Sequence, residues 1–377
     1  MPLVNLPAFA PDLIADLEGL GTERVDTPVI QPAEPFLDMA GEDLRRRIFL
    51  TESETGRSLC LRPEFTIPVC LRHIETATGT PKRYAYLGEV FRQRREGSNE
   101  FYQAGIEDLG EPDVAKADAR AVHDALAVLM NRLPGVAFSV VLGDQAVFEA
   151  VVAACGLPGG WQKRLVHAFG NQAQLQRLMA DLSNPARDGV FGPEVDRLAI
   201  LGKLDDEATL IAHIDATMEA TGYSTNASRS PADIARRLRE KMELANTRLD
   251  ARTLALLKEF LALELNLSEA PGALAAFAEK AGLSLGAALE PFESRVAALR
   301  ATGVDPATIT YRAAFGRPLD YYTGLVFEIA PAGEALVLAG GGRFDRLLTL
   351  LGAKERIPAV GFSLWLDRIA GVKGAAA

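Results

Sequence analysis

The sequence has few of the residues that build metal centres or disulfide frameworks. Its 377 residues include three cysteines, Cys60, Cys70 and Cys155, and no two of them form a C-x-x-C pair. The four histidines are scattered without the short spacing of metal ligands: His73, His123, His167 and His213. Zinc sites and disulfide scaffolds need such clusters. We therefore expect no metal, no cofactor and reduced thiols.

Long apolar runs and an excess of positive charge are also missing. The first 20 residues contain acids and prolines, where a signal peptide needs a basic start and an unbroken apolar run. No later stretch reaches the roughly 18 apolar residues of a membrane helix. Lys and Arg number 40 against 50 Asp and Glu, so the net charge is −10, a poor balance for neutralising phosphates. We expect a soluble cytoplasmic protein with no membrane partner, and nucleic acid is disfavoured.

The spacing of apolar residues predicts a first part that mixes helices and strands. Residues 83–92 and 101–107 are two β-rich runs around turn residues, and they predict an antiparallel hairpin. Helical spacing marks residues 11–20 and 122–133, and residues 136–142 have the pattern of a strand.

The middle of the chain differs from both ends. Residues 145–302 are almost wholly helical in pattern, with Ser230 and Pro231 as an N-cap and first-turn pair. After Pro306, strands are predicted at 308–315, 319–329, 335–340 and 359–362, with short helices from Arg343 and about Leu364. With 48% hydrophobic residues, the chain can build two or three cores. We predict an α+β domain formed by residues 1–150 and 305–377, interrupted by a mainly helical insertion of residues 151–304.

Four segments place charged and polar groups inside strand-like apolar sequence, where unsatisfied burial is costly. They are residues 61–66, 91–107, 317–324 and 340–345. Together they supply carboxylates, an amide, a tyrosine pair and arginines, a set that suits a small zwitterion. Each segment alone also fits a solvated face or a cross-strand ion pair. The Gly340–Gly342 run alone favours a bend or bulge, and alternation along a strand would turn one of Tyr321 and Tyr322 into the core.

The order and the amino-acid sequences of these segments resemble those of the motifs of histidyl-tRNA synthetase, a class II aminoacyl-tRNA synthetase. The matching motifs are LRPEFT, FR followed by EFYQAGIE, RPLDYYTGLVFE, GGGRFDRLLTLLG and PAVGFSLWLDR, in that order. Thr27-Pro28-Val29-Ile30 resembles motif 1, which contributes to the dimer interface in the family. The resemblance covers most of residues 10–150 and 305–372. It implies an antiparallel sheet flanked by helices, with a helical insertion domain.

The resemblance also implies a histidine pocket. Glu64, Thr66 and Gln103 would surround the amino group, while Glu107 and Tyr321 would face the imidazole. Tyr322 would support the pocket wall. Arg92 matches the arginine of motif 2, Arg317 the arginine that assists activation, and Arg368 the arginine of motif 3.

Departures from the family affect the ATP half of that site. Arg94 stands where the family has a glutamate that helps to hold ATP, and the loop after it is short. Trp365 replaces a glycine of motif 3 and would project towards the place of ATP, although it could also be a core aromatic. The early Arg-Gly-Thr-x-Asp element has no counterpart. Because the sequence ends shortly after Arg368, we expect no anticodon-binding domain.

An intact amino-acid half beside a damaged ATP half resembles the regulatory subunits of short-form ATP phosphoribosyltransferase. That family implies no catalytic residues, a hetero-octamer with the catalytic subunit, a homodimer of this chain, and free histidine as ligand. The histidine feedback site would be either this pocket or the interface with the catalytic subunit. Two alternatives are a divergent synthetase-like enzyme that activates histidine and a detached tRNA-sensing domain, which the acidity disfavours.

Overall fold

The computed structural model describes residues 6–39, 42–95, 97–183, 207–220, 230–246, 249–317, 319 and 321–375. Pro318 and Asp320 of the predicted RPLDYYTG motif and part of the predicted helical insertion lie outside these residues. The chain forms two compact units, one of Met1–Val151, Phe169–Asn171 and Glu259–Ala377, the other of Val152–Ala168 and Gln172–Lys258. The division at 150 and 304 stays a prediction.

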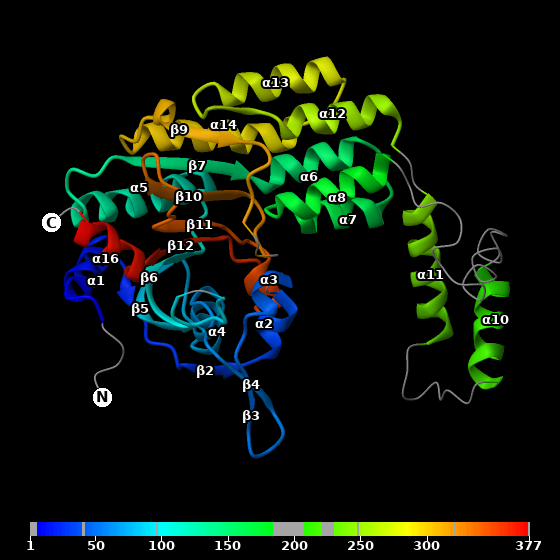
Figure 1. Cartoon of the computed structure of the whole chain (residues 1–377), viewed down its shortest axis with the longest axis horizontal. Helices are drawn as coiled ribbons and strands as arrows, with labels where there is room; N and C mark the ends of the chain where they lie inside the picture. The colour runs from blue at the N-terminus through cyan, green and yellow to red at the C-terminus, as the bar shows by residue number, and fades with distance from the viewer. Residues whose placement is uncertain are drawn as a thin grey trace. The chain divides into compact units, whose positions relative to one another are not determined.

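The first unit is built on a nine-stranded sheet (Figure 1). Its strands follow the order β1 (Glu23–Arg24), β5 (Lys82–Phe91), β6 (Glu100–Leu109), β12 (Ala359–Trp365), β11 (Ala339–Arg343), β10 (Leu325–Pro331), β7 (Phe138–Asp144), β9 (Ile309–Arg312) and β8 (Glu264–Asn266). All neighbours from β5 to β7 are antiparallel, while β1–β5 and β7–β9 are parallel. The predicted α+β class is confirmed, since both ends of the chain contribute central strands to one sheet.

The predicted hairpin is strands β5 and β6. They pair from Lys82↔Leu109 to Phe91↔Glu100 without interruption. Gly97 lies in the connection with a φ of 81°, a conformation that glycine adopts without a steric penalty. Alternation along β6 then directs Gln103 and Glu107 to one face of the sheet and Asp108 to the other.

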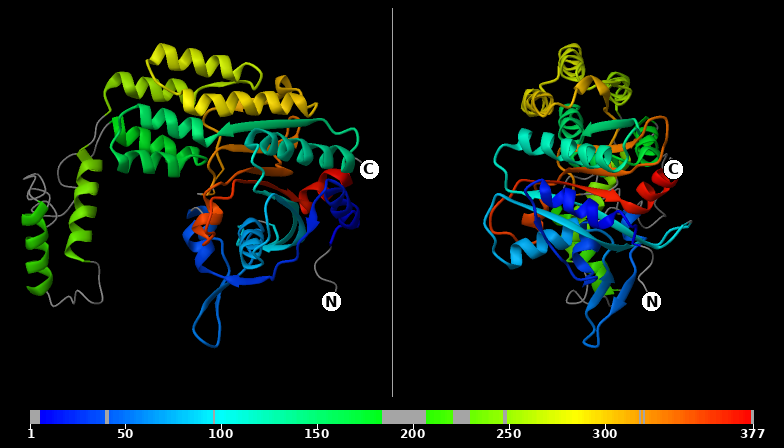
Figure 2. Two further views of the ribbon diagram at one scale, coloured as in Figure 1. Left: turned by 180° about the vertical axis from the view of Figure 1, so that it is seen from behind. Right: turned by 90° about the vertical axis from the view of Figure 1, so that its left-hand side faces the viewer.

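Helices cover the face towards which Asp108 points. Helix α5 (Val114–Arg132) begins at the N-cap Asp113, whose carboxylate accepts from the backbone N–H of Lys116 at 3.0 Å. It packs on β6, β10, β11 and β12, and α14 (Gly286–Ala301) packs against it (Figure 2). Helices α1 (Ala10–Gly19) and α16 (Leu366–Ala375) contact β6. Helix α13 (Ala270–Ala281) and the 3-10 turn η1 (Pro306–Thr308) lie in the same unit.

The opposite face of the sheet carries the aromatic core of the unit. This core includes Phe65, Tyr86 and Phe344, all buried. Helices α4 (Thr66–Glu75) and α15 (Leu347–Leu350) pack together there. A second sheet has the order β2 (Ile30–Pro32), β4 (Ser58–Leu61) and β3 (Leu50–Glu52), with α2 (Glu34–Met39) and α3 (Glu42–Arg45) between β2 and β3 in sequence.

The second unit is helical in its described residues. It contains α7 (Gly159–Ala168), α8 (Gln172–Ser183), α10 (Glu207–Ala220) and α11 (Pro231–Asn246). The predicted N-cap at Ser230 is confirmed, because its hydroxyl accepts from the N–H of Asp233 at 3.1 Å. Helices α6 (Gln145–Ala154) and α12 (Ala251–Leu261) each begin in one unit and end in the other. Among the described residues, no helix is both long and apolar enough to cross a membrane.

Two predicted strand boundaries near the end of the chain were wrong. The strand predicted from Leu319 begins at Leu325, and the strand predicted at 335–340 is displaced to Ala339–Arg343. The glycine run Gly340–Gly342 is therefore a central strand and no bend, paired with β10 on one side and β12 on the other. Because these glycines have no side chains, the side chains of Arg317 and Tyr322 can lie directly on the strand.

Candidate ligand pocket

A pocket lies on the sheet face that carries Gln103, beside the first turn of helix α4. Its volume is about 90 Å³, whereas one water molecule needs only about 10–15 Å³. Seven of the eight residues predicted for the histidine site line it: Glu64, Thr66, Arg92, Gln103, Arg317, Tyr321 and Tyr322. The eighth, Glu107, is buried behind them and hydrogen-bonded to Thr66. The structure thus brings the predicted set together.

Glu64 is fixed by the start of helix α4. Its two carboxylate oxygens accept from the backbone N–H groups of Thr66, at 2.7 Å, and Ile67, at 2.9 Å. The first N–H groups of a helix have no intrahelical partners. The N-cap residue Phe65 has no side-chain acceptor for them, so the carboxylate of Glu64 caps the helix instead. Burial raises the pKa of Glu64, and these N–H donors oppose that rise.

Glu107 and Gln103 leave acceptors unused. The hydroxyl of Thr66 donates to Oε1 of Glu107 at 2.8 Å. Oε2 of Glu107 and Oε1 of Gln103 are buried and have no hydrogen-bond partner among the described residues. Burial raises the pKa of Glu107 well above its usual value, and the nearby carboxylate of Glu64 adds to the rise. The pocket is therefore short of hydrogen-bond donors and of positive charge next to Glu107.

Two glycines make room for pocket side chains. A Cβ at Gly361, which pairs with Glu107 across β12 and β6, would stand 1.8 Å from Oε2 of Glu107. A Cβ at Gly340 would stand 2.9 Å from the guanidinium carbon of Arg317. Both distances are shorter than any van der Waals contact, so glycine at these positions allows the two side chains to lie on the strands.

The arginines supply the positive side of the pocket. Nε of Arg92 donates to the carbonyl of Pro63 at 2.7 Å, and burial lowers its pKa to about 10. Arg317 donates to the hydroxyl of Tyr322 at 3.0 Å and forms an ion pair with Glu328 at 3.3 Å. Guanidinium groups held in this way are suited to a carboxylate.

The tyrosine pair differs from its prediction. Tyr321 and Tyr322 are both buried and both line the pocket, with ring centroids 5.1 Å apart. Both rings also belong to the aromatic core, so the expected core position is confirmed, but the expected alternation to opposite faces was wrong because these residues precede β10. Burial raises the pKa of Tyr321 well above its usual value, and Glu64 adds to this effect.

The two residues that depart from the motifs of the family, Trp365 and Arg94, have arginine or aromatic side chains next to them. Trp365 lines the pocket and is 5% exposed, and it also belongs to the aromatic core. The guanidinium carbons of Arg368 and Arg317 lie 4.8 Å and 5.7 Å from its ring centroid. Arg94 lies over the ring of Phe101 at 3.6 Å and forms an ion pair with Asp367 at 3.7 Å.

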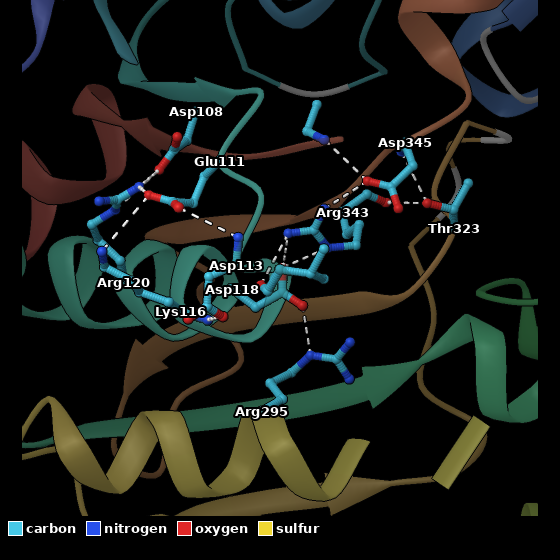
Figure 3. Close-up of polar contacts among 12 residues, drawn as sticks. Asp108, Glu111, Asp113, Lys116, Asp118, Arg120, Arg295, Thr323, Arg343 and Asp345 are labelled. Atoms are coloured by element: carbon cyan, nitrogen blue, oxygen red, sulfur yellow. Dashed lines mark hydrogen bonds and ion pairs between the residues drawn. The ribbon is translucent and has the colours of Figure 1, made fainter. Parts of the chain in front are cut away.

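Some charged residues of the four polar segments lie outside the pocket. Arg62 is buried and donates to backbone carbonyls, including that of Glu89 at 2.8 Å. Arg343 and Asp345 belong to a buried ion-pair network on the helix-covered face (Figure 3). Because Gly342 and Arg343 are consecutive in β11, they point to opposite faces of the sheet.

Arg47, Phe344 and Ser363 line the pocket but were not predicted as site residues. Arg47 ends an Arg-Arg-Arg run that begins at the last residue of α3, and a run of this kind is more often a solvated surface. The carbonyl of Arg47 accepts from the N–H of Gln93 at 2.8 Å, a contact distant in sequence. No local signal in the sequence indicates this pairing.

Comparisons with known proteins agree with the motifs. The histidyl-tRNA synthetase family model matches residues 8–221 and 235–369. An ATP phosphoribosyltransferase regulatory subunit from Sinorhizobium medicae is 74% identical over 369 residues, which are 98% of each chain. A solved structure of an ATP phosphoribosyltransferase regulatory subunit/histidyl-tRNA synthetase from Bacillus halodurans has a TM-score of 0.63 at 19% identity, over 96% of this chain and 77% of that one. Histidyl-tRNA synthetase from Nostoc has a TM-score of 0.63 at 16% identity, over 100% of this chain and 76% of that one.

The two solved structures share the fold, so the predicted class II synthetase-like architecture is confirmed. The curated relative extends the agreement over nearly the whole sequence. The chain therefore belongs to the histidyl-tRNA synthetase family and, within it, to the ATP phosphoribosyltransferase regulatory subunits.

Proposed function

We propose that this regulatory subunit of ATP phosphoribosyltransferase binds free histidine in the pocket between β6, β12 and helix α4, and so makes the catalytic subunit sensitive to the end product. We further propose that it has no synthetase activity and binds no tRNA. Its partners would be a second copy of itself and the short-form catalytic subunit, in a hetero-octamer.

The observation that carries the histidine proposal is the pair of unpartnered acceptors, Oε2 of Glu107 and Oε1 of Gln103. Buried acceptors without donors cost about 1–3 kcal/mol each. A ligand with an ammonium group and an imidazole N–H supplies the missing donors. Its carboxylate finds guanidinium groups at Arg92 and Arg317, which line the same pocket.

Feedback needs more than binding. A ligand shifts an equilibrium between two states only if it binds them with different affinity. We propose that histidine binds to the active and the inhibited assembly with different affinities. Tyr321, Tyr322 and Thr66 line the pocket and would contact the bound histidine, so their positions would change with the state of the assembly. The alternative of a divergent enzyme that activates histidine is not favoured, since the curated relative is named a regulatory subunit.

The test is co-purification with the short-form catalytic subunit, followed by an assay with and without histidine. The proposal predicts a complex whose phosphoribosyltransferase activity depends on this chain and falls when histidine is added. Calorimetry on the isolated chain then locates the ligand, because this pocket should take up histidine without the partner. A complex that forms and is inhibited although the isolated chain takes up no histidine would move the feedback site to the interface.

A further inference from the structure

We propose that Thr323 is a positioning residue of the pocket. Its hydroxyl group ties the tyrosine segment, residues 321–324, to the buried ion-pair network behind the sheet, and this link sets the affinity for histidine. The inference rests on the proposed function for its ligand, but the position of the segment can be tested without a ligand.

The tyrosine segment needs such a tie because it has no regular secondary structure. Strand β10 begins only at Leu325. The backbone N–H of Tyr322 donates a long hydrogen bond to the carbonyl of Leu319, at 3.5 Å. The rings of Tyr321 and Tyr322 instead pack against β11 and the residues after it. Tyr321 meets Phe344 edge to face at 5.9 Å between centroids, and a Cβ at Gly342 would stand 2.8 Å from the ring of Tyr322.

Thr323 is where the segment is hydrogen-bonded to residues 343–345. Its backbone N–H donates to the carbonyl of Arg343 at 2.8 Å. Its hydroxyl oxygen accepts from the N–H of Asp345 at 3.0 Å and lies 3.4 Å from the same carbonyl of Arg343. The side chain therefore meets both a donor and an acceptor of the neighbouring backbone.

Residues 343–345 are in turn held by buried charges. The guanidinium of Arg343 donates to Asp345 at 2.6 Å and to Asp118 of helix α5 at 2.7 Å. Asp118 also accepts from Arg295 of helix α14 at 2.6 Å. Figure 3 shows these four residues together, with Thr323 next to Asp345. The side chains of Asp118, Arg295 and Arg343 are at most 5% exposed and that of Asp345 is 12% exposed, so the network has little freedom to rearrange.

The ion-pair network and the pocket lie on opposite faces of strand β11. Gly342 lies under the ring of Tyr322 on the pocket face, and Arg343 points to the helices on the other face. A displacement of residues 343–345 relative to residues 321–324 therefore moves the tyrosine rings relative to Glu107 and Gln103. The hydroxyl of Thr323 opposes that displacement.

Thr323 permits a cleaner experiment than the charged residues do. Removal of Arg343 or Asp118 would leave a buried charge without its partner and could unfold the chain. Thr323→Val keeps the branched shape and removes the hydroxyl, while Thr323→Ser keeps the hydroxyl. Thr302→Val is a matched control, because the hydroxyl of Thr302 donates to the carbonyl of Leu299 at 2.7 Å at the end of helix α14.

Two measurements on the full chain test the inference. Hydrogen–deuterium exchange of peptides that cover residues 321–326 should become faster in Thr323→Val and stay unchanged in Thr323→Ser and Thr302→Val. Calorimetry with histidine should give a dissociation constant about tenfold higher for Thr323→Val alone, equivalent to a loss of about 1.4 kcal/mol. Equal melting temperatures of the valine and serine variants would separate this effect from a global loss of stability.

The two claims fail in different ways. If the wild-type chain takes up no histidine, the proposed function fails, and the exchange rates alone decide the role of Thr323. Unchanged exchange of residues 321–326 in Thr323→Val overturns the inference, whatever the ligand. Faster exchange with an unchanged histidine affinity overturns the claim that the link sets the affinity.

Discussion

The hydroxyl of Thr66 donates a 2.8 Å hydrogen bond to Oε1 of Glu107, and it thereby joins the first turn of helix α4 to the middle of strand β6. The same threonine gives its backbone N–H to Glu64. Two buried carboxyl groups are thus held beside one residue, but only Glu107 keeps an oxygen without a partner among the described residues. This oxygen lies against Gly361, which lines the pocket.

Glu107→Gln should weaken histidine binding by about tenfold to a hundredfold. The substitution removes the negative charge, and a hydrogen bond to a charged group contributes about 1.5–3 kcal/mol. Calorimetry on the isolated chain measures the affinity, and inhibition of the complex by histidine should weaken in parallel. Glu100→Gln, an exposed carboxyl at the start of β6, is the control. Unchanged affinity and unchanged inhibition in Glu107→Gln would mean that the pocket has no part in feedback.

The same substitution should stabilise the ligand-free chain above about pH 5. Because the pKa of Glu107 is raised in the folded state, its contribution to the free energy of unfolding is fully present below the unfolded pKa, near 4.5. That contribution is lost as the pH rises through the folded pKa. A glutamine has no such loss, so the Tm of Glu107→Gln should exceed that of the wild type by more at about pH 8 than at about pH 5. A Tm difference that shrinks as the pH rises would contradict the direction of this shift.

Much of the site follows from the sequence because its residues come from local patterns. The hairpin of β5 and β6 has turn residues between two β-rich runs, and alternation along β6 places Gln103 and Glu107 on one face. The grouping of Glu64 and Tyr321 with them is different, since these residues are far apart in the sequence. It followed only from the resemblance to histidyl-tRNA synthetase.

Other features depend on tertiary contacts that leave no local signal. The Gly340–Gly342 run has the composition of a bend, but β10 and β12 pair with it on both sides. Arg343 donates a hydrogen bond to Asp118, which lies 225 residues away in sequence. Polar residues in an apolar strand therefore indicate a buried partner, but the sequence alone does not distinguish a ligand from another side chain.

Gly340→Ala should weaken histidine binding through Arg317. The added Cβ would stand 2.9 Å from the guanidinium carbon, so the arginine must move away from its position beside Tyr322. Calorimetry should show lower affinity, and a histidine analogue without the carboxylate should lose much less. Gly272→Ala is the control, because nothing lies within 4 Å of a Cβ there and the residue lies in helix α13. It should raise stability by up to about 1 kcal/mol. Equal losses for histidine and its analogue would argue against a carboxylate contact at Arg317.

The chain should be a homodimer, and Ile30→Lys should shift it towards monomer. Ile30 belongs to the motif 1 match and is 57% exposed on β2, at an edge of the small sheet. An exposed apolar residue on a sheet edge favours association, and a lysine there opposes it. Light scattering at micromolar concentration measures the mass. Leu350→Lys is the control, since Leu350 is 63% exposed at the end of α15. A monomeric wild-type chain, or equal effects of both lysines, would count against this interface.

The isolated chain should show no histidine-dependent exchange of pyrophosphate into ATP. Trp365 lines the pocket at a position where the resemblance to histidyl-tRNA synthetase implies a glycine, and Arg368 and Arg317 lie near its ring. The same resemblance implies that Arg94 stands in place of a glutamate that helps to hold ATP, and Arg94 forms an ion pair with Asp367 at 3.7 Å.

A histidyl-tRNA synthetase assayed under the same conditions provides the positive control for this exchange. Trp365→Ala is a poor test of the same point, because removal of a buried tryptophan costs about 3–5 kcal/mol and could unfold the pocket. The wild-type measurement is therefore decisive. Histidine can bind without being activated if the amino-acid half of the site is retained and the ATP half is closed. Exchange by a pure sample at a rate near that of the control would show that the ATP half is open, and the chain would then have to be considered an enzyme.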